Sequence, residues 1–344
     1  MAAHPKRIPL SLALQGGGAH GAFTWGVLDA LLEQGRFSFD GISGTSAGAM
    51  NAVALADGWL AGGADAARER LAGFWEGVAM LAPSEPMSPM VDASLPGLGT
   101  NWMLQLSRWF SPYQLNPLDL NPLRDLVEET FDFERLRSQS TIELFIAATH
   151  ANTGHLKLFR NAELSVDALL ASACLPSIHR AVVIDGEPYW DGAYSANPAV
   201  FPLFRFCASR DILIVMLAPL SHDRTPRSAE EIQQRTLELG FNNSFLREMR
   251  LLAAMREMTE QSGWLAGTLE QRLRSMRFHL VEATEALDGL GALSKIVANQ
   301  AFLHRLRDAG RAHAQSWLAA HGEAVGRRSS INVGDVFLPP VVVS

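Results

Sequence analysis

Short apolar runs alternate with longer amphipathic stretches along this chain. The short runs have the length of strands and end near glycine, proline or polar residues. They cover residues 8–14, 39–43, 141–150 and 211–219. Between the first two runs, Trp25, Leu28, Leu31 and Leu32 recur at helical spacing, and Gly35 provides a helix stop. Strands that alternate with helices predict an α/β domain with a largely parallel sheet.

Two hairpins are expected in the middle of the chain. Residues 155–159 can pair with the strand before them, and residues 181–185 can pair with 188–190 across a glycine turn. Helical patterns at 64–80 and 164–174 separate these strands from their neighbours. The hairpins add antiparallel strands to the predicted sheet.

The pattern becomes mainly helical after Ser221. The predicted helices cover 228–261, 265–275 and 293–325, with one further strand at 276–281. Arginines lie among the leucines of this region, and we interpret them mostly as solvated helix faces. They are Arg247, Arg250, Arg256, Arg272, Arg274 and Arg277. We expect a core domain at 1–220 and a mainly helical extension at 221–344 packed on it.

Residues 82–122 differ in character from the rest of the core. They hold 7 of the 17 prolines and an apolar cluster. The cluster consists of Leu95, Leu98, Trp102, Met103, Leu104, Leu106, Trp109 and Phe110. Several of its members fit one face of a short helix, so two interpretations remain open. The cluster is either a lid that contacts a lipid surface or a permanent cover over the sheet.

Composition narrows the class of protein. The chain has 344 residues, 48% of them apolar, and a net charge of -7 from 29 basic and 36 acidic residues. That charge argues against nucleic acid as a partner. Cys174 and Cys207 are the only cysteines, too few for a disulfide framework or a zinc site, and they favour a reducing compartment. We expect no metal and no cofactor.

The first residues carry a weak resemblance to a signal peptide. Lys6 and Arg7 precede the apolar run 8–14, but glycines follow it in place of a cleavage site, so we interpret the run as the first strand. The longest apolar run, 212–220, is far shorter than the roughly 18 residues of a membrane helix. We expect a soluble, cytoplasmic protein that makes at most transient contact with a membrane surface.

The first chemical motif lies between the predicted strand 39–43 and a helix. Gly44-Thr45-Ser46-Ala47-Gly48 matches G-x-S-x-G at a strand-to-helix turn, the context of a nucleophile elbow. Such a turn holds the hydroxyl of Ser46 clear of the backbone. The helix that follows places free N–H groups, including that of Ala47, beside the serine, where negative charge on a substrate oxygen would be stabilised.

The second motif is the glycine loop that follows the first strand. Gly16, Gly18 and Gly21 match G-x-G-x-x-G, and Asp40 falls where a ribose-binding acid could lie, so an NAD(P)-binding Rossmann protein is an alternative. That alternative leaves the Ser46 motif unexplained. Both loops end parallel strands and therefore share one sheet edge. The N–H groups of Gly16, Gly17 and Gly18 are then candidate oxyanion donors opposite Ser46.

The third motif, Asp191-Gly192-Ala193, supplies a candidate base for Ser46, because a free hydroxyl is a poor nucleophile. Taken alone, an aspartate before glycine is more often a turn residue. The D-G-A motif becomes informative because it follows a glycine loop and a serine elbow in this order.

The three motifs together resemble the patatin-like phospholipase family, and the stretch 171–176 resembles its A-S-x-x-x-P block. The resemblance covers about 8–219, and the remainder resembles an extension found in a bacterial branch of the family. It implies a three-layer α/β/α core and metal-free hydrolysis of lipid acyl esters by a dyad of Ser46 as nucleophile and Asp191 as proton acceptor. The family commonly has arginine or lysine where this chain has His20, which we expect to be largely neutral.

Other enzymes share parts of this pattern. A conventional triad would take its histidine from those after Asp191, namely His222, His279, His304, His313 and His321. An acyltransferase or thioesterase with the same elbow is a further alternative, although acyltransferases of the malonyl type usually have histidine where Thr45 stands. The head group, the acyl chain and the oligomeric state are left open by the sequence.

Overall fold

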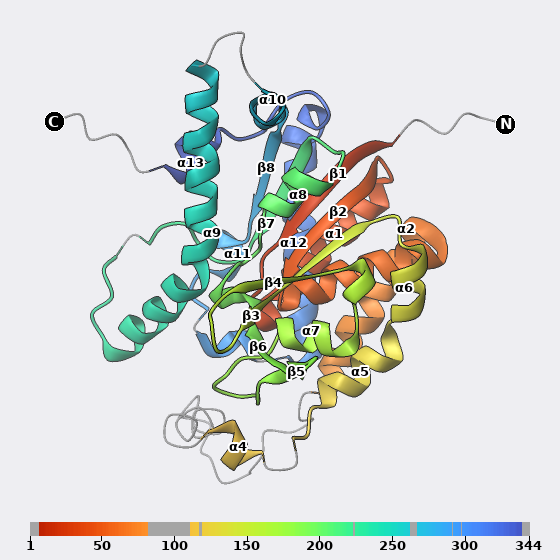
Figure 1. The fold of residues 1–344 in the computed structure, drawn as a ribbon, viewed down its shortest axis with the longest axis vertical. Helices are drawn as coiled ribbons and strands as arrows, with labels where there is room; N and C mark the ends of the chain where they lie inside the picture. The colour runs from red at the N-terminus through yellow and green to blue at the C-terminus, as the bar shows by residue number, and fades with distance from the viewer. Residues whose placement is uncertain are drawn as a thin grey trace.

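The computed structural model describes residues 7–81, 111–116, 119–222, 224–261, 267–290, 292–296 and 298–338. Eight strands form a single sheet in the order β5-β6-β3-β2-β1-β7-β8, with β4 also paired to β3 (Figure 1). The strands are β1 (Ile8–Leu14), β2 (Phe37–Thr45), β3 (Glu143–His150), β4 (Leu156–Arg160), β5 (Val182–Ile184), β6 (Glu187–Asp191), β7 (Asp211–Met216) and β8 (Arg277–Glu282). The central pairings are parallel, and those of β4, β5 and β6 are antiparallel.

Helices cover both faces of the sheet. Leu10, Leu12 and Leu14 of β1 point into the core under α1, α2 and α12, whereas Ala13 joins the core under α8, α9, α10 and α13. The larger helices are α1 (Gly21–Gln34), α2 (Ala47–Leu81), α5 (Pro122–Thr130), α6 (Phe133–Gln139), α7 (Val166–Ser172), α8 (Phe201–Phe206), α9 (Ala229–Gln261), α10 (Thr268–Ser275) and α12 (Gln300–His321). Short helices are η1 (Gly18–His20), α4 (Pro112–Leu115), η2 (Asn161–Glu163), η3 (Gly192–Tyr194), α11 (Thr284–Leu287), η4 (Ala292–Lys295), η5 (Gly322–Ala324) and α13 (Val333–Phe337). The predicted three-layer α/β/α architecture with a mainly parallel sheet is confirmed.

The predicted elements largely coincide with the observed ones. The first strand is confirmed at both ends, and α1 ends where Gly35 adopts the left-handed conformation, with a φ of 64°. Both hairpins form. The helix that follows Ser46 runs to Leu81 with a break at Gly62 and Gly63, which separates the two helical patterns of the sequence. The apolar cluster between Leu95 and Phe110 lies outside the described residues.

The pairing of β3 brings two distant segments end to end. One edge of β3 pairs with β4, so β2 and β6 share its other edge. Thr45, the last residue of β2, pairs with Ala147, and Asp191, the last residue of β6, pairs with the adjacent Ala148. Because β2 and β6 run in opposite directions, their carboxyl ends meet. Ser46 and Asp191 are therefore neighbours in space.

The C-terminal extension adds a strand to the sheet and contributes helices to both of its faces, α12 to one and α9, α10 and α13 to the other. β8 extends the parallel sheet beyond β7, as the sequence predicted for this segment. α12 crosses α1 at two glycines: a Cβ at Gly26 would lie 1.9 Å from the Arg307 carbonyl oxygen, and one at Gly310 would lie 2.0 Å from that of Phe23. Only glycine permits so close a crossing. We propose that 1–220 and 221–344 form one folding unit.

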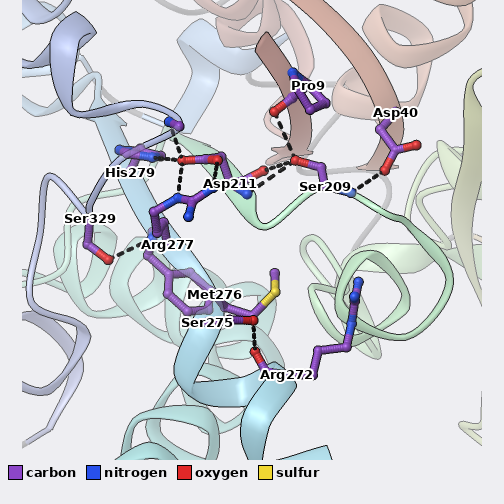
Figure 2. Close-up of polar contacts among 12 residues, drawn as sticks. Pro9, Asp40, Ser209, Asp211, Arg272, Ser275, Met276, Arg277, His279 and Ser329 are labelled. Carbon is purple, nitrogen blue, oxygen red and sulfur yellow. Dashed lines mark hydrogen bonds and ion pairs between the residues drawn. The ribbon is translucent and has the colours of Figure 1, made fainter. Parts of the chain in front are cut away.

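A buried polar cluster holds the extension at the sheet end opposite Ser46 (Figure 2). The Asp211 carboxylate, at the start of β7, accepts hydrogen bonds from Arg277 at 2.9 and 2.6 Å, from the Gly326 N–H, and lies 3.0 Å from His279 Nε2. These partners outweigh burial and lower the pKa of Asp211 to about 2. The cluster ties β7, β8 and the segment after α12 together.

The arginines of the extension are only partly solvated. Arg247 and Arg250 are exposed, as predicted, whereas Arg256, Arg272, Arg274 and Arg277 are half-buried. Five of the six donate hydrogen bonds to protein acceptors: Arg250 to Phe337, Arg256 to Met276, Arg272 to Phe204 and Cys207, Arg274 to Thr259, and Arg277 to Asp211. The planar guanidinium group lets arginine satisfy buried carbonyl oxygens while its stem packs on apolar neighbours. A leucine-rich helical pattern in the sequence does not reveal that its arginines bind backbone carbonyl oxygens.

Candidate active site

Ser46 lies on a strained turn between β2 and α2. Its φ of 54° falls in the left-handed region, which is unusual for a residue other than glycine. The turn is closed from both sides: a Cβ at Gly44 would lie 2.5 Å from the Gly48 carbonyl oxygen, and one at Gly48 would lie 2.2 Å from that of Leu14. The Ser46 N–H donates to Ser172 Oγ at 2.9 Å. The G-x-S-x-G stretch therefore forms the turn that the sequence predicted.

The glycine loop lies directly against this turn. A Cβ at Gly16 would lie 2.9 Å from that of Ser46, and one at Gly21 would lie 2.6 Å from that of Ala47. Gly18 has a φ of 58° and closely approaches the Lys295 carbonyl oxygen. The loop of β1 and the turn of β2 thus form one continuous backbone surface beside the serine.

Some backbone N–H groups of this surface already donate hydrogen bonds within the protein, and others do not. That of Gly16 donates to Asn197 Oδ1 at 2.7 Å, so the structure does not favour Gly16 as an oxyanion donor. In the described part of the chain, the N–H groups of Gly17, Gly18 and Ala47 have no recorded acceptor. Gly17 is the N-cap of η1, and Gly18 and Ala47 are the first residues of η1 and α2, where N–H groups lack partners within the helix. They remain free to meet a substrate oxygen.

Asp191 is almost completely buried at the end of β6, with 1% of its surface exposed. Burial raises the pKa of its carboxyl to about 7, although the hydrogen bond from the Ala193 N–H and the nearby Ser46 side chain lower it. Asp191 Oδ1 accepts from the Ala193 N–H at 2.8 Å. A Cβ at Gly192 would lie 2.3 Å from the Ala147 carbonyl oxygen, so the D-G-A stretch also fits tightly against β3.

His20 is the last residue of η1 and lies within the glycine loop, next to Gly21. Burial and the nearby Lys295 lower the pKa of this histidine to about 4, so it is neutral at neutral pH. Its Nε2 lies 2.7 Å from Ser294 Oγ. The sequence led us to expect a largely neutral His20 because of the helix dipole. The structure gives burial as the main cause.

Several buried polar residues that hold the site were missed in the sequence. Gln15 Oε1 accepts the N–H groups of Leu217 and Ala218 at 2.6 and 2.9 Å, and its Nε2 donates to Asn242. Thr45 donates to the Ala196 carbonyl oxygen. With Asn197 and Ser172, these residues fix the loops around Ser46. Only Ser172 carried a signal, through the A-S-x-x-x-P resemblance; a single polar residue in an apolar stretch does not reveal a buried partner.

A cavity of about 410 Å³ opens beside Ser46. The glycine loop, Ser46 and Asp191 line one end of it, and most of the remaining wall is apolar. The apolar wall includes Met50, Phe74, Trp75, Val78, Leu123, Leu175, Ile178, Leu217, Phe241 and Ile296. Such a cavity suits an acyl chain whose carbonyl group lies at Ser46. Part of the wall comes from α9 and the segment after η4, which belong to the extension.

The alternatives weighed from the sequence find little support in this geometry. Asp40 lies near the start of β2 and accepts the Ser209 N–H at 2.6 Å, at the sheet end opposite the glycine loop (Figure 2). None of the five histidines after Asp191 lines the described wall of the cavity. His279 faces Asp211 and His222 faces Glu238. A histidine not singled out before, His179, does line the cavity, and burial lowers its pKa.

A mainly parallel sheet between two layers of helices, with a serine on a strand-to-helix turn, is typical of hydrolases with an α/β fold. The family model of the patatin-like phospholipases matches residues 12–204, more than half of the chain. The chain therefore belongs to the patatin-like phospholipase family and is a lipid acyl hydrolase. The resemblance inferred from the three motifs is confirmed. No curated protein sequence matches the chain significantly.

Two solved structures are similar to the chain at low identity. VipD from Legionella pneumophila is 15% identical with a TM-score of 0.43, over 92% of this chain and 67% of that one. A chain of the complex between full-length SpcU and full-length ExoU, from the type III secretion system of Pseudomonas aeruginosa, is 15% identical with a TM-score of 0.28. That match covers 97% of this chain and 82% of the other. Neither likeness is close enough to carry a functional inference.

The structure tests part of what we expected about membrane association and about the cysteines. None of the described helices is both long and apolar enough to cross a bilayer. Cys174 and Cys207 are buried free thiols, and burial raises the pKa of each to about 12, which leaves them unreactive.

Proposed function

We propose that the protein hydrolyses acyl esters of lipids through a dyad of Ser46 and Asp191. The observation that carries the proposal is the meeting of the two residues at the ends of β2 and β6, where the Ser46 side chain lies close enough to the Asp191 carboxyl to lower its pKa. The strained turn presents the Ser46 hydroxyl to the cavity. The buried carboxylate of Asp191 is a stronger base than an exposed one, because burial raises its pKa towards neutrality.

The reaction proceeds in two halves. Ser46 Oγ attacks the ester carbonyl carbon while Asp191 accepts the hydroxyl proton, and the carbonyl oxygen becomes negatively charged. We assign the stabilisation of this oxyanion to the free N–H groups of Gly17, Gly18 and Ala47 at the starts of η1 and α2. Collapse releases the alcohol, which takes the proton from Asp191, and leaves an acyl-Ser46 ester. Water activated by Asp191 then releases the fatty acid.

Hydrolysis of a soluble ester should depend on the ionisation of Asp191. The carboxylate accepts a proton only when ionised, and burial raises its pKa to about 7. We expect kcat/KM for a short-chain p-nitrophenyl ester to fall as pH drops below about 7 and to level off above it. The measurement is kcat/KM between about pH 5 and pH 9. A profile that is flat over this range would contradict Asp191 as the base.

A further inference from the structure

Lys295 is brought to the candidate active site by the C-terminal extension. It is one of only three lysines in the chain, with Lys6 and Lys157. It ends η4 and lines the Ser46 cavity. Its carbonyl oxygen packs on Gly18, where a Cβ would lie 2.3 Å away, and the preceding Ser294 is hydrogen-bonded to His20. The lysine is therefore fixed beside the glycine loop.

Lys295 is the single lysine or arginine along the described wall of this cavity. The other titratable residues that line the wall are Asp191, Glu238 and His179. His179 is mainly uncharged, because burial lowers its pKa. The sign of the electrostatic potential near Ser46 thus depends on Lys295 and on whether other positive groups pair with the two carboxylates.

The carboxylate of Glu238 already pairs with other side chains. Its Oε2 atom lies 3.0 Å from His222 Nε2 and 3.3 Å from an Arg235 nitrogen. Glu238 raises the pKa of Lys295, but burial lowers it more. In the described part of the chain, the Lys295 ammonium has no recorded hydrogen-bond acceptor. The Lys295 side chain is half-buried in the cavity wall. A partly desolvated ammonium group without an acceptor gains stability when an anion binds to it.

We propose that Lys295 binds the phosphate group of a phospholipid substrate and thereby sets the preference for phosphate-bearing over neutral lipid esters. This inference rests on the proposed function. A glycerophospholipid carries its ester and its phosphate on the same glycerol unit, only a few bonds apart. With the acyl chain in the apolar cavity and the carbonyl group at Ser46, the phosphate is carried to the cationic part of the wall. Lysine commonly binds phosphate as a point charge.

The test compares two short-chain substrates below their micelle concentrations. Dihexanoyl phosphatidylglycerol carries the phosphate, and dihexanoylglycerol does not. Lys295→Met should lower kcat/KM for the phospholipid by roughly 10- to 100-fold, mainly through KM, because it removes a charge-assisted hydrogen bond. It should change turnover of the neutral ester by less than about threefold. Lys295→Arg should retain more activity on the phospholipid than Lys295→Met does.

The matched control is Lys157→Met. Lys157 lies on β4, where it pairs with Glu163, and its loss should alter neither substrate's kcat/KM. Equal losses on both substrates with Lys295→Met would overturn the proposal, because the residue would then act on the reacting ester or on folding. No loss on either substrate would overturn it too. The melting temperature of each variant separates a binding defect from misfolding.

A binding measurement keeps this test separate from catalysis. In a Ser46→Ala background, Lys295→Met should weaken binding of a diether analogue of the phospholipid and leave the neutral diether unchanged. If the wild-type protein hydrolyses neither ester, the proposed hydrolase function fails, and this comparison still decides the role of Lys295. Inorganic phosphate alone should compete weakly; competition as strong as that of the diether lipid would indicate a site for free phosphate and contradict the proposal.

Discussion

Ser46→Ala is expected to abolish hydrolysis of a short-chain p-nitrophenyl ester, with a loss of roughly 10⁴- to 10⁶-fold in kcat. The reason is that the hydroxyl is the only group of Ser46 that can form the acyl ester. Alanine keeps the Cβ and the backbone N–H, which donates to Ser172, so the turn should survive. The measurement is initial rate together with melting temperature. Full residual activity would refute Ser46 as the nucleophile.

Ser43→Ala is the matched control for this variant. Ser43 lies in β2, three residues before Ser46, is fully buried, and its hydroxyl has no hydrogen-bond partner in the described part of the chain. Removing an unsatisfied buried hydroxyl should not lower stability. Activity should therefore stay near the parent value. The pair separates the chemistry of Ser46 from the general effect of losing a serine hydroxyl at this end of β2.

Asp191→Asn should reduce kcat by about 10³- to 10⁴-fold while leaving the protein at least as stable as the parent. The amide oxygen can still accept the Ala193 N–H, but the amide is no base. Burial raises the pKa of Asp191 to about 7, which means that the charged carboxylate destabilises the folded state at higher pH. The neutral amide removes that penalty. A lower melting temperature together with normal turnover would contradict the proposed role.

Replacement of His222 by alanine separates a dyad from a triad. His222 lies beside Glu238 in a groove lined by Arg224, Arg227 and Arg235, and not along the wall that contains Ser46. We expect His222→Ala to keep most of the activity on a soluble ester. An enzyme as inactive as Asp191→Asn would instead assign the base to a histidine.

Much of the fold could be predicted because its signals are local. The first strand, the Gly35 helix stop and both hairpins follow from apolar periodicity and turn residues within a few positions. The strand at 276–281 was visible for the same reason. The Ser46 turn was predictable because tight backbone approach at Gly44 and Gly48 leaves a fixed glycine spacing in the sequence.

What could not be predicted depends on pairings between distant segments. The family resemblance implied that Ser46 and Asp191 act together, but no residue pattern encodes why they meet, which is that β2 and β6 share one edge of β3. The hydrogen bond from the Gly16 N–H to Asn197 also joins segments that are far apart in the sequence. Lys295 reaches the cavity only because η4 packs on the glycine loop. The sequence predicted an extension packed on the core but gave no sign that it supplies part of the cavity wall.

The role predicted for the apolar cluster between Leu95 and Phe110 stays a prediction, because the cluster lies outside the described residues. Phe74, Val78 and Leu123, from the helices on either side of this insertion, line the Ser46 cavity. Both flanks of residues 82–122 therefore reach the site, which is where a lid would have to act.

Covalent labelling by a fluorophosphonate probe tests the central claim most directly, because the probe reacts with an activated serine and imitates the tetrahedral state. We predict one adduct, located at Ser46 by peptide mass spectrometry, formed by the parent protein and by Ser43→Ala. Ser46→Ala should form none, and labelling of Asp191→Asn should be strongly slowed. An adduct at any other serine, or undiminished labelling of Ser46→Ala, would contradict Ser46 as the nucleophile.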